Sequence, residues 1–189
     1  MADTDAERLA DLLARQADLQ REAARVVADL DLMALLGRLG RVEVIGSAAS
    51  GLMVWRDLDI SVHTSASRAE VADVVRDLVA HPEVADLHFT GPHTPSGLPK
   101  DQRYYAVLHH RGWKVDLSLW TSTGPSGGFS DAAALRDRLD DETRAAILVI
   151  KDHWCRLDEY PDVVSGVDVY DAVLDHGVRT VEEFRARLG

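Results

Sequence analysis

The sequence of 189 residues has a single cysteine and no long apolar run. Because Cys155 stands alone, neither an intrachain disulfide nor a cysteine zinc cluster can form. No segment approaches the roughly 20 consecutive apolar residues that a membrane-spanning helix needs. The acidic start, MADTDAERLADLL, lacks the basic and apolar parts of a signal peptide. We therefore expect a cytoplasmic protein that does not cross a membrane.

Basic residues are also scarce, and no stretch of the chain is rich in them. Lys100, Lys114 and Lys151 are the only lysines, and 21 basic against 32 acidic residues give a formal net charge of −11. Such a surface repels phosphate backbones unless basic residues gather on one face. The charge weighs against a nucleic-acid partner and favours a small, cationic one. It leaves nucleotide binding open, since Mg²⁺ bridges carboxylates to phosphates.

The first part of the chain is expected to be helical. Residues 5–36 contain neither Gly nor Pro, which predicts one or two long helices. Apolar residues recur there at a 3.5-residue spacing: Leu9, Leu12, Leu19, Val26, Leu30 and Met33. The pattern predicts a helix that covers a sheet, and a homodimer through this N-terminal helix is the alternative.

The middle of the chain alternates strands with one helix, and the end is helical. We expect strands at 41–47, 57–62, 84–89, 103–110 and 113–120, and a helix at 67–82 capped by Ser67 and Glu70. Residues 91–102 and 121–128 are expected to form a loop and a linker. Four helices are expected at 131–139, 142–155, 167–176 and 180–188. The prediction is an α/β fold, with an N-terminal helical segment (1–40), a catalytic domain with a mixed sheet flanked by helices (41–129) and a C-terminal helical annex (130–189).

Three aspartates lie in strands whose other face is apolar. Side chains alternate between the two faces of a strand, so Asp57 and Asp59 share a face that Leu58 does not. Asp116 has the same position in the strand 113–120, and it joins the other two if the strands are neighbours. Three convergent carboxylates suit a hard cation such as Mg²⁺. The alternative is three solvated aspartates on an exposed sheet face.

A small-residue turn precedes these aspartates. Gly46 and Ser47 close one strand and open a helix start whose N–H groups suit a triphosphate. The turn is not a Walker loop, because Leu52 and Met53 stand where Lys and Ser or Thr belong. A plain strand-to-helix turn is the alternative.

The string IGSAASGLMVWRDLDISV resembles the signature of the DNA polymerase beta-like nucleotidyltransferase superfamily. That signature has an apolar strand, Gly-Ser, a nine-residue gap and Asp-x-Asp, and Asp116 matches its third carboxylate. The resemblance covers about residues 41–120 and is nearest to the small antibiotic-modifying members. It implies that Asp57, Asp59 and Asp116 are catalytic and bind two Mg²⁺ ions, or Mn²⁺. Gly46 and Ser47 would hold the phosphates of an NTP, expected to be ATP.

The helical end carries a looser resemblance to terminal uridylyl- and poly(A)-type members. ILVIKDHW is similar to a helix whose lysine reaches the triphosphate, which implies that role for Lys151. SGVDVYDAVL is similar to the segment that places a hydroxyl near the phosphates and an aromatic ring on the base, which implies base stacking by Tyr170. Asp168 and Val169 stand where serines are usual, so Ser165 is the candidate hydroxyl. Lys151 as a helix-end cation and Tyr170 as a core residue are the alternatives.

Three functions follow from these patterns. The first is transfer of a nucleotidyl group from NTP to a hydroxyl of a small, cationic acceptor. The second is toxin-type modification of tRNA or protein. The third is a non-catalytic partner protein that keeps the fold, which the presence of Gly46, Ser47 and all three aspartates disfavours.

Overall fold

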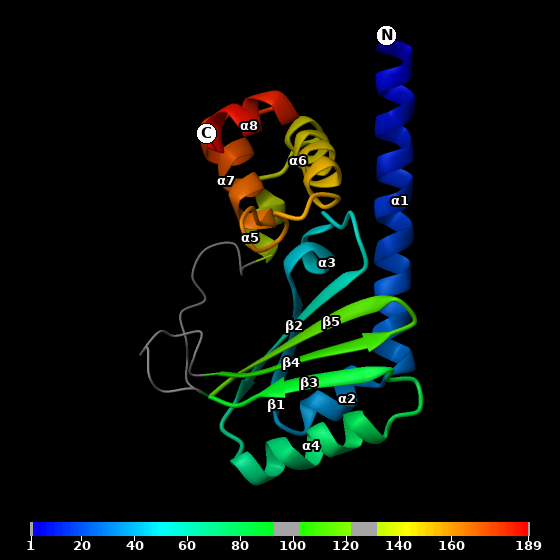
Figure 1. Cartoon of the computed structure of the whole chain (residues 1–189), viewed down its shortest axis with the longest axis vertical. Helices are drawn as coiled ribbons and strands as arrows, with labels where there is room; N and C mark the ends of the chain where they lie inside the picture. The colour runs from blue at the N-terminus through cyan, green and yellow to red at the C-terminus, as the bar shows by residue number, and fades with distance from the viewer. Residues whose placement is uncertain (1, 93–102, 122–131, 189) are drawn as a thin grey trace.

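The computed structural model describes residues 2–92, 103–121 and 132–188. It shows a five-stranded mixed sheet with flanking helices and a group of C-terminal helices, which confirms the predicted fold class (Figure 1). Most of the predicted loop 91–102 and linker 121–128 lies outside the described residues. None of the helices described here combines the length and apolarity needed to cross a bilayer.

The sheet has the order β1-β2-β5-β4-β3, and only β2 and β5 run parallel to each other. The strands are β1 (Gly40–Ile45), β2 (Asp57–Thr64), β3 (Asp86–Thr90), β4 (Arg103–His110) and β5 (Trp113–Trp120). Alternate residues of the central strands are buried, Leu58 and Ile60 completely. The condition for convergence of the aspartates is thus met, because the two aspartate-bearing strands lie side by side.

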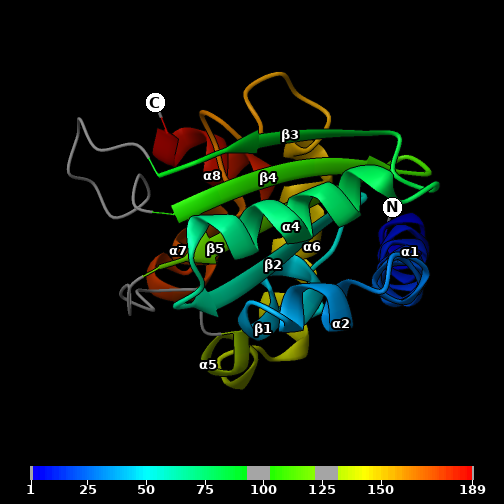
Figure 2. The same ribbon diagram turned by 90° about the horizontal axis from the view of Figure 1, so that it is seen from below.

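Helices α2 (Leu32–Gly37) and α4 (Arg68–Ala80) pack on one face of the sheet (Figures 1 and 2). Helix α4 begins at the predicted cap, where the Ser67 hydroxyl and the Glu70 carboxylate each accept from the other's backbone N–H. Val71, Val74 and Leu78 of α4 enter one core with the apolar side chains of the strands. One sheet face is therefore covered, and the aspartates occupy the other.

A second core lies among the C-terminal helices α5 (Ala132–Asp137), α6 (Asp141–Trp154), α7 (Gly166–His176) and α8 (Val181–Leu188). The chain that leads into β2 is held by both cores. Leu52 and Val54 are buried among the C-terminal helices, whereas Met53 between them belongs to the core of the sheet. This double anchorage fixes the approach to Asp57.

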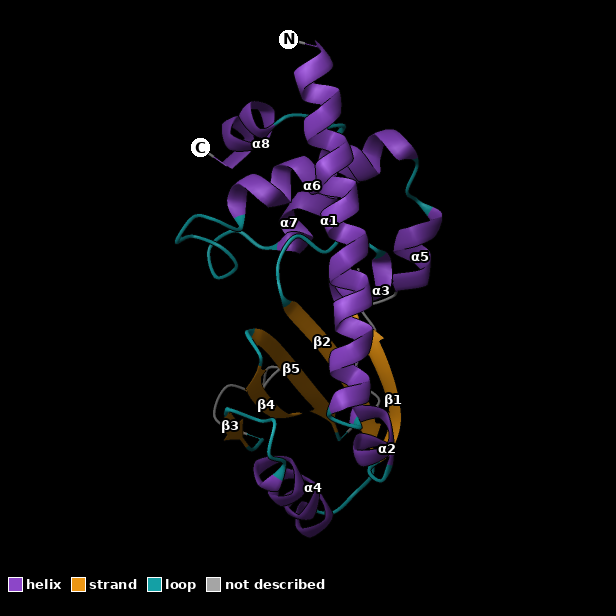
Figure 3. Ribbon diagram, turned by 90° about the vertical axis from the view of Figure 1, so that its right-hand side faces the viewer, coloured by secondary structure: helices purple, strands orange, loops and turns teal. Residues whose placement is uncertain are grey.

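Helix α1 (Ala2–Asp29) runs past both the sheet and the C-terminal helices (Figures 1 and 3). Its second half enters the core of the sheet through Leu19, Val26 and other apolar residues. Arg15 pairs with the buried Asp152 of α6. The predicted apolar series fails at Met33, which is 44% exposed, because the helix breaks at Asp31, whose φ is 46°.

Candidate nucleotide and metal site

The three aspartates lie on one face of β2 and β5. Asp59 is directly opposite Asp116 in the parallel pairing, and Asp57 is opposite Lys114. All three side chains are half-buried. The parallel register therefore produces the convergence that the alternation of each strand predicts.

Lys114 is the cation of this cluster. Its Nζ lies 2.7 Å from Oδ2 of Asp116 and 3.3 Å from Oδ1 of Asp57. Burial raises the pKa of Asp57 despite that ion pair. Burial, followed by the negative charges of Asp57 and Asp116, raises the pKa of Asp59 to about 7. The ionised cluster is thus only partly neutralised by the protein's own charges.

The Gly46–Ser47 turn lies against Asp59. Gly46 opens the short helix α3 (Gly46–Ser50) with a φ of 63°, in the left-handed region that favours glycine. A Cβ at this position would stand 2.5 Å from Oδ2 of Asp59. The close approach explains why glycine is needed here and puts the turn in contact with the carboxylate cluster.

Ser47, Lys151 and Tyr170 meet beside that turn, although 104 positions separate the first two. The Lys151 Nζ donates to the Ser47 Oγ at 2.8 Å, to the Leu52 carbonyl at 2.8 Å and to the Tyr170 hydroxyl at 3.0 Å. Lys151 is completely buried and Tyr170 is 4% exposed. The structure thus joins three of the proposed nucleotide-binding residues into one network at the junction of the two cores.

Ser165 occupies a different kind of position. It is the N-cap of α7, where its hydroxyl donates to the Asp168 carboxylate at 2.7 Å and accepts from the Asp168 N–H. Asp168, which stands where the related pattern has serine, completes this capping box. The Ser165 hydroxyl is therefore engaged with its own helix in this conformation.

Two aromatic side chains also lie near the carboxylates, and one of them, Tyr160, was not expected there from the sequence. Trp55 and Tyr160 are half-buried and meet edge to face, with ring centroids 5.7 Å apart. Burial chiefly raises the pKa of Tyr160, and the charges of Asp57 and Asp59 add to the effect. Lys114 was within reach of sequence reasoning, because it shares its strand face with Asp116. Tyr160 lies in the loop between α6 and α7, and nothing in the sequence around it predicts that it comes close to the carboxylates.

The polar face of the sheet continues beyond Asp116 toward the other end of β5. Arg103 lies 4.6 Å from the ring centroid of Tyr105 and 5.2 Å from that of Trp120, and its Nη1 donates to the Ser118 Oγ at 2.6 Å. Burial and then the charge of Asp116 raise the pKa of Tyr105 to about 12. This side of Asp116 is therefore lined by an arginine and two aromatic rings.

The donor set fits a divalent cation, although the carboxylates are not closed into a chelate. Within the described ranges, no group of three His, Cys, Asp or Glu side chains is gathered tightly enough to hold a metal ion. Oδ1 of Asp116 is nevertheless buried with no hydrogen-bond partner among those residues. A buried carboxylate oxygen is costly without a partner, and a hard cation is the partner that such oxygens prefer.

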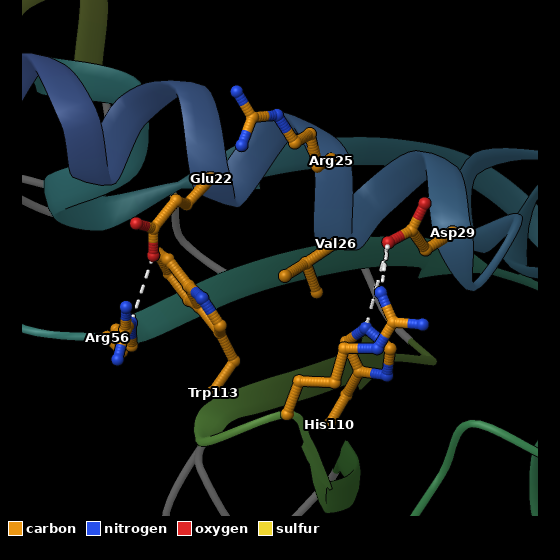
Figure 4. Close-up of a pocket in the computed structure, with 8 residues that line it drawn as sticks. Glu22, Arg25, Val26, Asp29, Arg56, His110 and Trp113 are labelled. Carbon is orange, nitrogen blue, oxygen red and sulfur yellow. Dashed lines mark hydrogen bonds and ion pairs between the residues drawn. The ribbon is translucent and has the colours of Figure 1, made fainter.

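A shallow pocket of about 180 Å³ lies behind this site, between α1 and the turn of the β4–β5 hairpin (Figure 4). Ion pairs cross it from Arg56 to Glu22 at 2.9 Å and from Arg111 to Asp29 at 3.4 Å. Trp113 is buried in its wall, on the opposite side of β5 from Lys114. The pocket therefore belongs to the seating of α1 on the sheet rather than to the carboxylate face.

Neither a protein-family model nor a curated protein matches this sequence. Solved structures do match. Cid1, described as an RNA terminal uridylyl transferase, is 16% identical with a TM-score of 0.60 over 89% of this chain and 53% of its own. CdnC of E. coli MS115-1, in a complex with HORMA-deltaN, is 18% identical with a TM-score of 0.52 over 93% and 65%. A c-di-GMP synthase, CdnE of Capnocytophaga granulosa, is 11% identical with a TM-score of 0.52 over 82% and 60%.

The chain thus spans between half and two thirds of the length of these three structures. At such low identity the likeness concerns the fold and not the substrate. It extends beyond residues 41–120, which carry the sequence signature, to α1 and the C-terminal helices. The chain has the DNA polymerase beta-like nucleotidyltransferase fold.

Proposed function

We propose that this protein is a metal-dependent nucleotidyltransferase that moves an NMP group from an NTP to an acceptor hydroxyl. ATP is the proposed NTP, and the cytoplasm is the proposed location. The observation that carries the proposal is the placement of Asp57, Asp59 and Asp116 on one sheet face, in contact with the Gly46–Ser47 turn. A structural sheet face has no need of three half-buried carboxylates around one lysine, since burying like charges costs stability.

The proposed roles follow from position. Asp57, Asp59 and Asp116 would bind two Mg²⁺ ions, and Mn²⁺ is the alternative metal. Bound there, the cations supply electrostatic stabilisation of the charge that develops on the transferring phosphoryl group. Asp116 accepts the proton of the acceptor hydroxyl, whose oxygen forms the new bond to the α-phosphorus. The bond to the β-phosphate oxygen breaks, and pyrophosphate leaves toward Gly46 and Ser47.

Lys151 is proposed to bind the triphosphate as a point charge. In this conformation its ammonium is enclosed by Ser47 and Tyr170, so it must exchange these partners for phosphate oxygens. Tyr170 has little free ring surface, which supports a role in holding Lys151 more than base stacking. The half-buried Trp55 and Tyr160 are the better candidates for contact with the base. The Ser165 hydroxyl can contact the phosphates only after it breaks its capping hydrogen bonds with Asp168.

For the acceptor, the net charge of −11 supports a small, cationic molecule. One observation favours a second class, a nucleotide or RNA end. Arg103 with the rings of Tyr105 and Trp120 lies on the far side of Asp116 from the Gly46–Ser47 turn. An in-line displacement puts the acceptor opposite the leaving pyrophosphate, so these groups are beside it. Arginine and aromatic rings suit phosphates and bases.

The test is incubation with each radiolabelled NTP and Mg²⁺ against aminoglycosides, lincosamides, nucleotides, tRNA and the protein itself. Transfer or pyrophosphate release that stops with EDTA and in Asp116→Asn is expected. Labelling of a cationic small molecule supports the first acceptor class, and salt-sensitive labelling of tRNA supports the second. Labelling of the protein indicates toxin-type modification. If no NTP is turned over or bound, the non-catalytic partner reading replaces the proposal.

A further inference from the structure

Lys114 occupies the centre of the carboxylate cluster. Its ammonium contacts both Asp57 and Asp116, at 3.3 and 2.7 Å, whereas no ion pair of Asp59 is found among the described residues. The side chains of Asp57 and Asp116 are 17% and 14% exposed, and that of Lys114 is 31% exposed. A cation that is less than one third exposed therefore holds two carboxylates that are mostly buried.

The position of Lys114 is set by the strands and not by a flexible loop. Lys114 lies two residues before Asp116 on β5, so both point to the same face, and it is paired in register with Asp57 of β2. Its four-carbon stem then needs only to lie along the face to reach both carboxylates. The ammonium holds Oδ2 of Asp116 and Oδ1 of Asp57, whereas Oδ1 of Asp116 has no hydrogen-bond partner among the described residues. A cation that bound both carboxylates would therefore lie directly beside this ammonium.

We infer that Lys114 is an internal counter-ion that competes with divalent metal for Asp57 and Asp116, so that metal binds only by displacing it. The inference rests on the proposed function, which takes these aspartates as metal ligands. A Mg²⁺ ion lies about 2.0–2.1 Å from its oxygen ligands, and the ammonium sits at 2.7 Å from one of those oxygens. Two cations on the same carboxylates repel each other strongly at such separations, even where the metal binds the other oxygen of Asp116.

Two consequences follow. Without metal, Lys114 stabilises the fold, because it offsets repulsion among half-buried carboxylates. When metal binds, the Lys114 side chain moves out into solvent, because its stem is flexible and its ammonium is readily hydrated. Free metal thus binds weakly, and the site is completed when the cation arrives on the phosphates of an NTP. Lys114 is in this sense a positioning residue that sets the metal affinity.

The experiment measures Mn²⁺ affinity by electron paramagnetic resonance and calorimetry, together with melting temperature, in the wild type and in Lys114→Met. Loss of the competing charge should tighten Mn²⁺ binding at least about tenfold. The metal-free variant should melt about 2–4 °C lower, and added Mn²⁺ should raise its melting temperature more than that of the wild type. Lys114→Arg, which keeps the charge, should bind Mn²⁺ as weakly as the wild type.

Arg68→Met is the control, because it removes an exposed cation at the start of α4. It should leave Mn²⁺ affinity unchanged. Lys114→Gln, which is neutral but still donates hydrogen bonds, replaces the methionine variant if that one does not fold. Equal or weaker Mn²⁺ binding in the neutral variants overturns the inference and leaves the metal site standing. If no form binds Mn²⁺, even with a non-hydrolysable NTP, both the inference and the proposed metal site fail.

Discussion

Asp59→Asn tests the electrostatics of the carboxylate cluster without any substrate. The pKa of Asp59 is about 7 in the folded protein, against about 3.9 in an unfolded chain. At pH 8 the ionised form therefore destabilises the fold by up to about 4 kcal/mol. The amide loses that charge but still has to be solvated, so we expect a gain of about 2 kcal/mol. In a domain of this size this raises the melting temperature by about 4–8 °C.

The raised pKa of Asp59 decides in which direction the stability of the wild type changes with pH. An acid whose pKa is raised by folding binds more protons in the native state, so wild-type stability falls as pH rises from about 4 to about 7. Asp59→Asn lacks this loss, so its advantage should be greatest at pH 8 and vanish near pH 4. Calorimetry in EDTA between these pH values measures the stability difference between the variant and the wild type. Asp11→Asn is the control, because it removes an exposed charge from α1. A variant less stable than the wild type at pH 8 would refute the repulsion. Mg²⁺ should narrow the gap, because it stabilises only the wild type.

Three further changes probe neighbouring features. Gly46→Ala combines a left-handed φ of 63° with a Cβ 2.5 Å from the Asp59 carboxylate, so urea unfolding should show a loss of about 2–3 kcal/mol and Mn²⁺ affinity should fall; unchanged values would contradict the close contact. Lys151→Met should leave the melting temperature within about 4 °C, since an apolar side chain replaces a buried charge, and should weaken NTP binding more than NMP binding in equilibrium dialysis; equal losses would count against the phosphate role. Asp152→Asn removes the carboxylate that holds Arg15 and Arg156, so we expect the free energy of unfolding to fall by about 1–3 kcal/mol. Hydrogen exchange in α1 should become faster around Arg15 but not around Val26, and a uniform change along α1 would argue against a local role of this contact.

Much of this fold could be predicted because its local signals agree with its tertiary structure. The strict alternation around Asp57 and Asp116 and the capping box of Ser67 and Glu70 specify their elements with no knowledge of the rest. Met33 shows the limit of such patterns. Its place in the apolar series is right for a continuous helix, but the left-handed Asp31 turns the chain and leaves Met33 exposed.

The site was less predictable because its parts come from distant segments. Register between β2 and β5 decides that Asp59 faces Asp116 and that Lys114 lies between the carboxylates, and no single strand contains that information. The meeting of Lys151 with Ser47 depends on the packing of the C-terminal helices. Sequence similarity suggested that Lys151 reaches the phosphates and that Tyr170 stacks on the base, but it gave no sign that the two side chains are bonded to each other. The burial of Tyr170 agrees with the alternative of a core residue.

The long helix α1 also restricts how the molecule can move. With 28 residues it is about 42 Å long, and it is attached to the sheet near Val26 and to α6 near Arg15. A wide hinge motion between the sheet and the C-terminal helices would have to bend this rod or detach one of its ends. For the proposed nucleotidyltransferase, exchange of the nucleotide at the junction would then depend on side-chain rearrangement and on the short segments around Leu52 and Tyr160. Cutting the chain within the first two turns of α1 should spare the fold, whereas cutting it after Arg15 should free the two halves to swing.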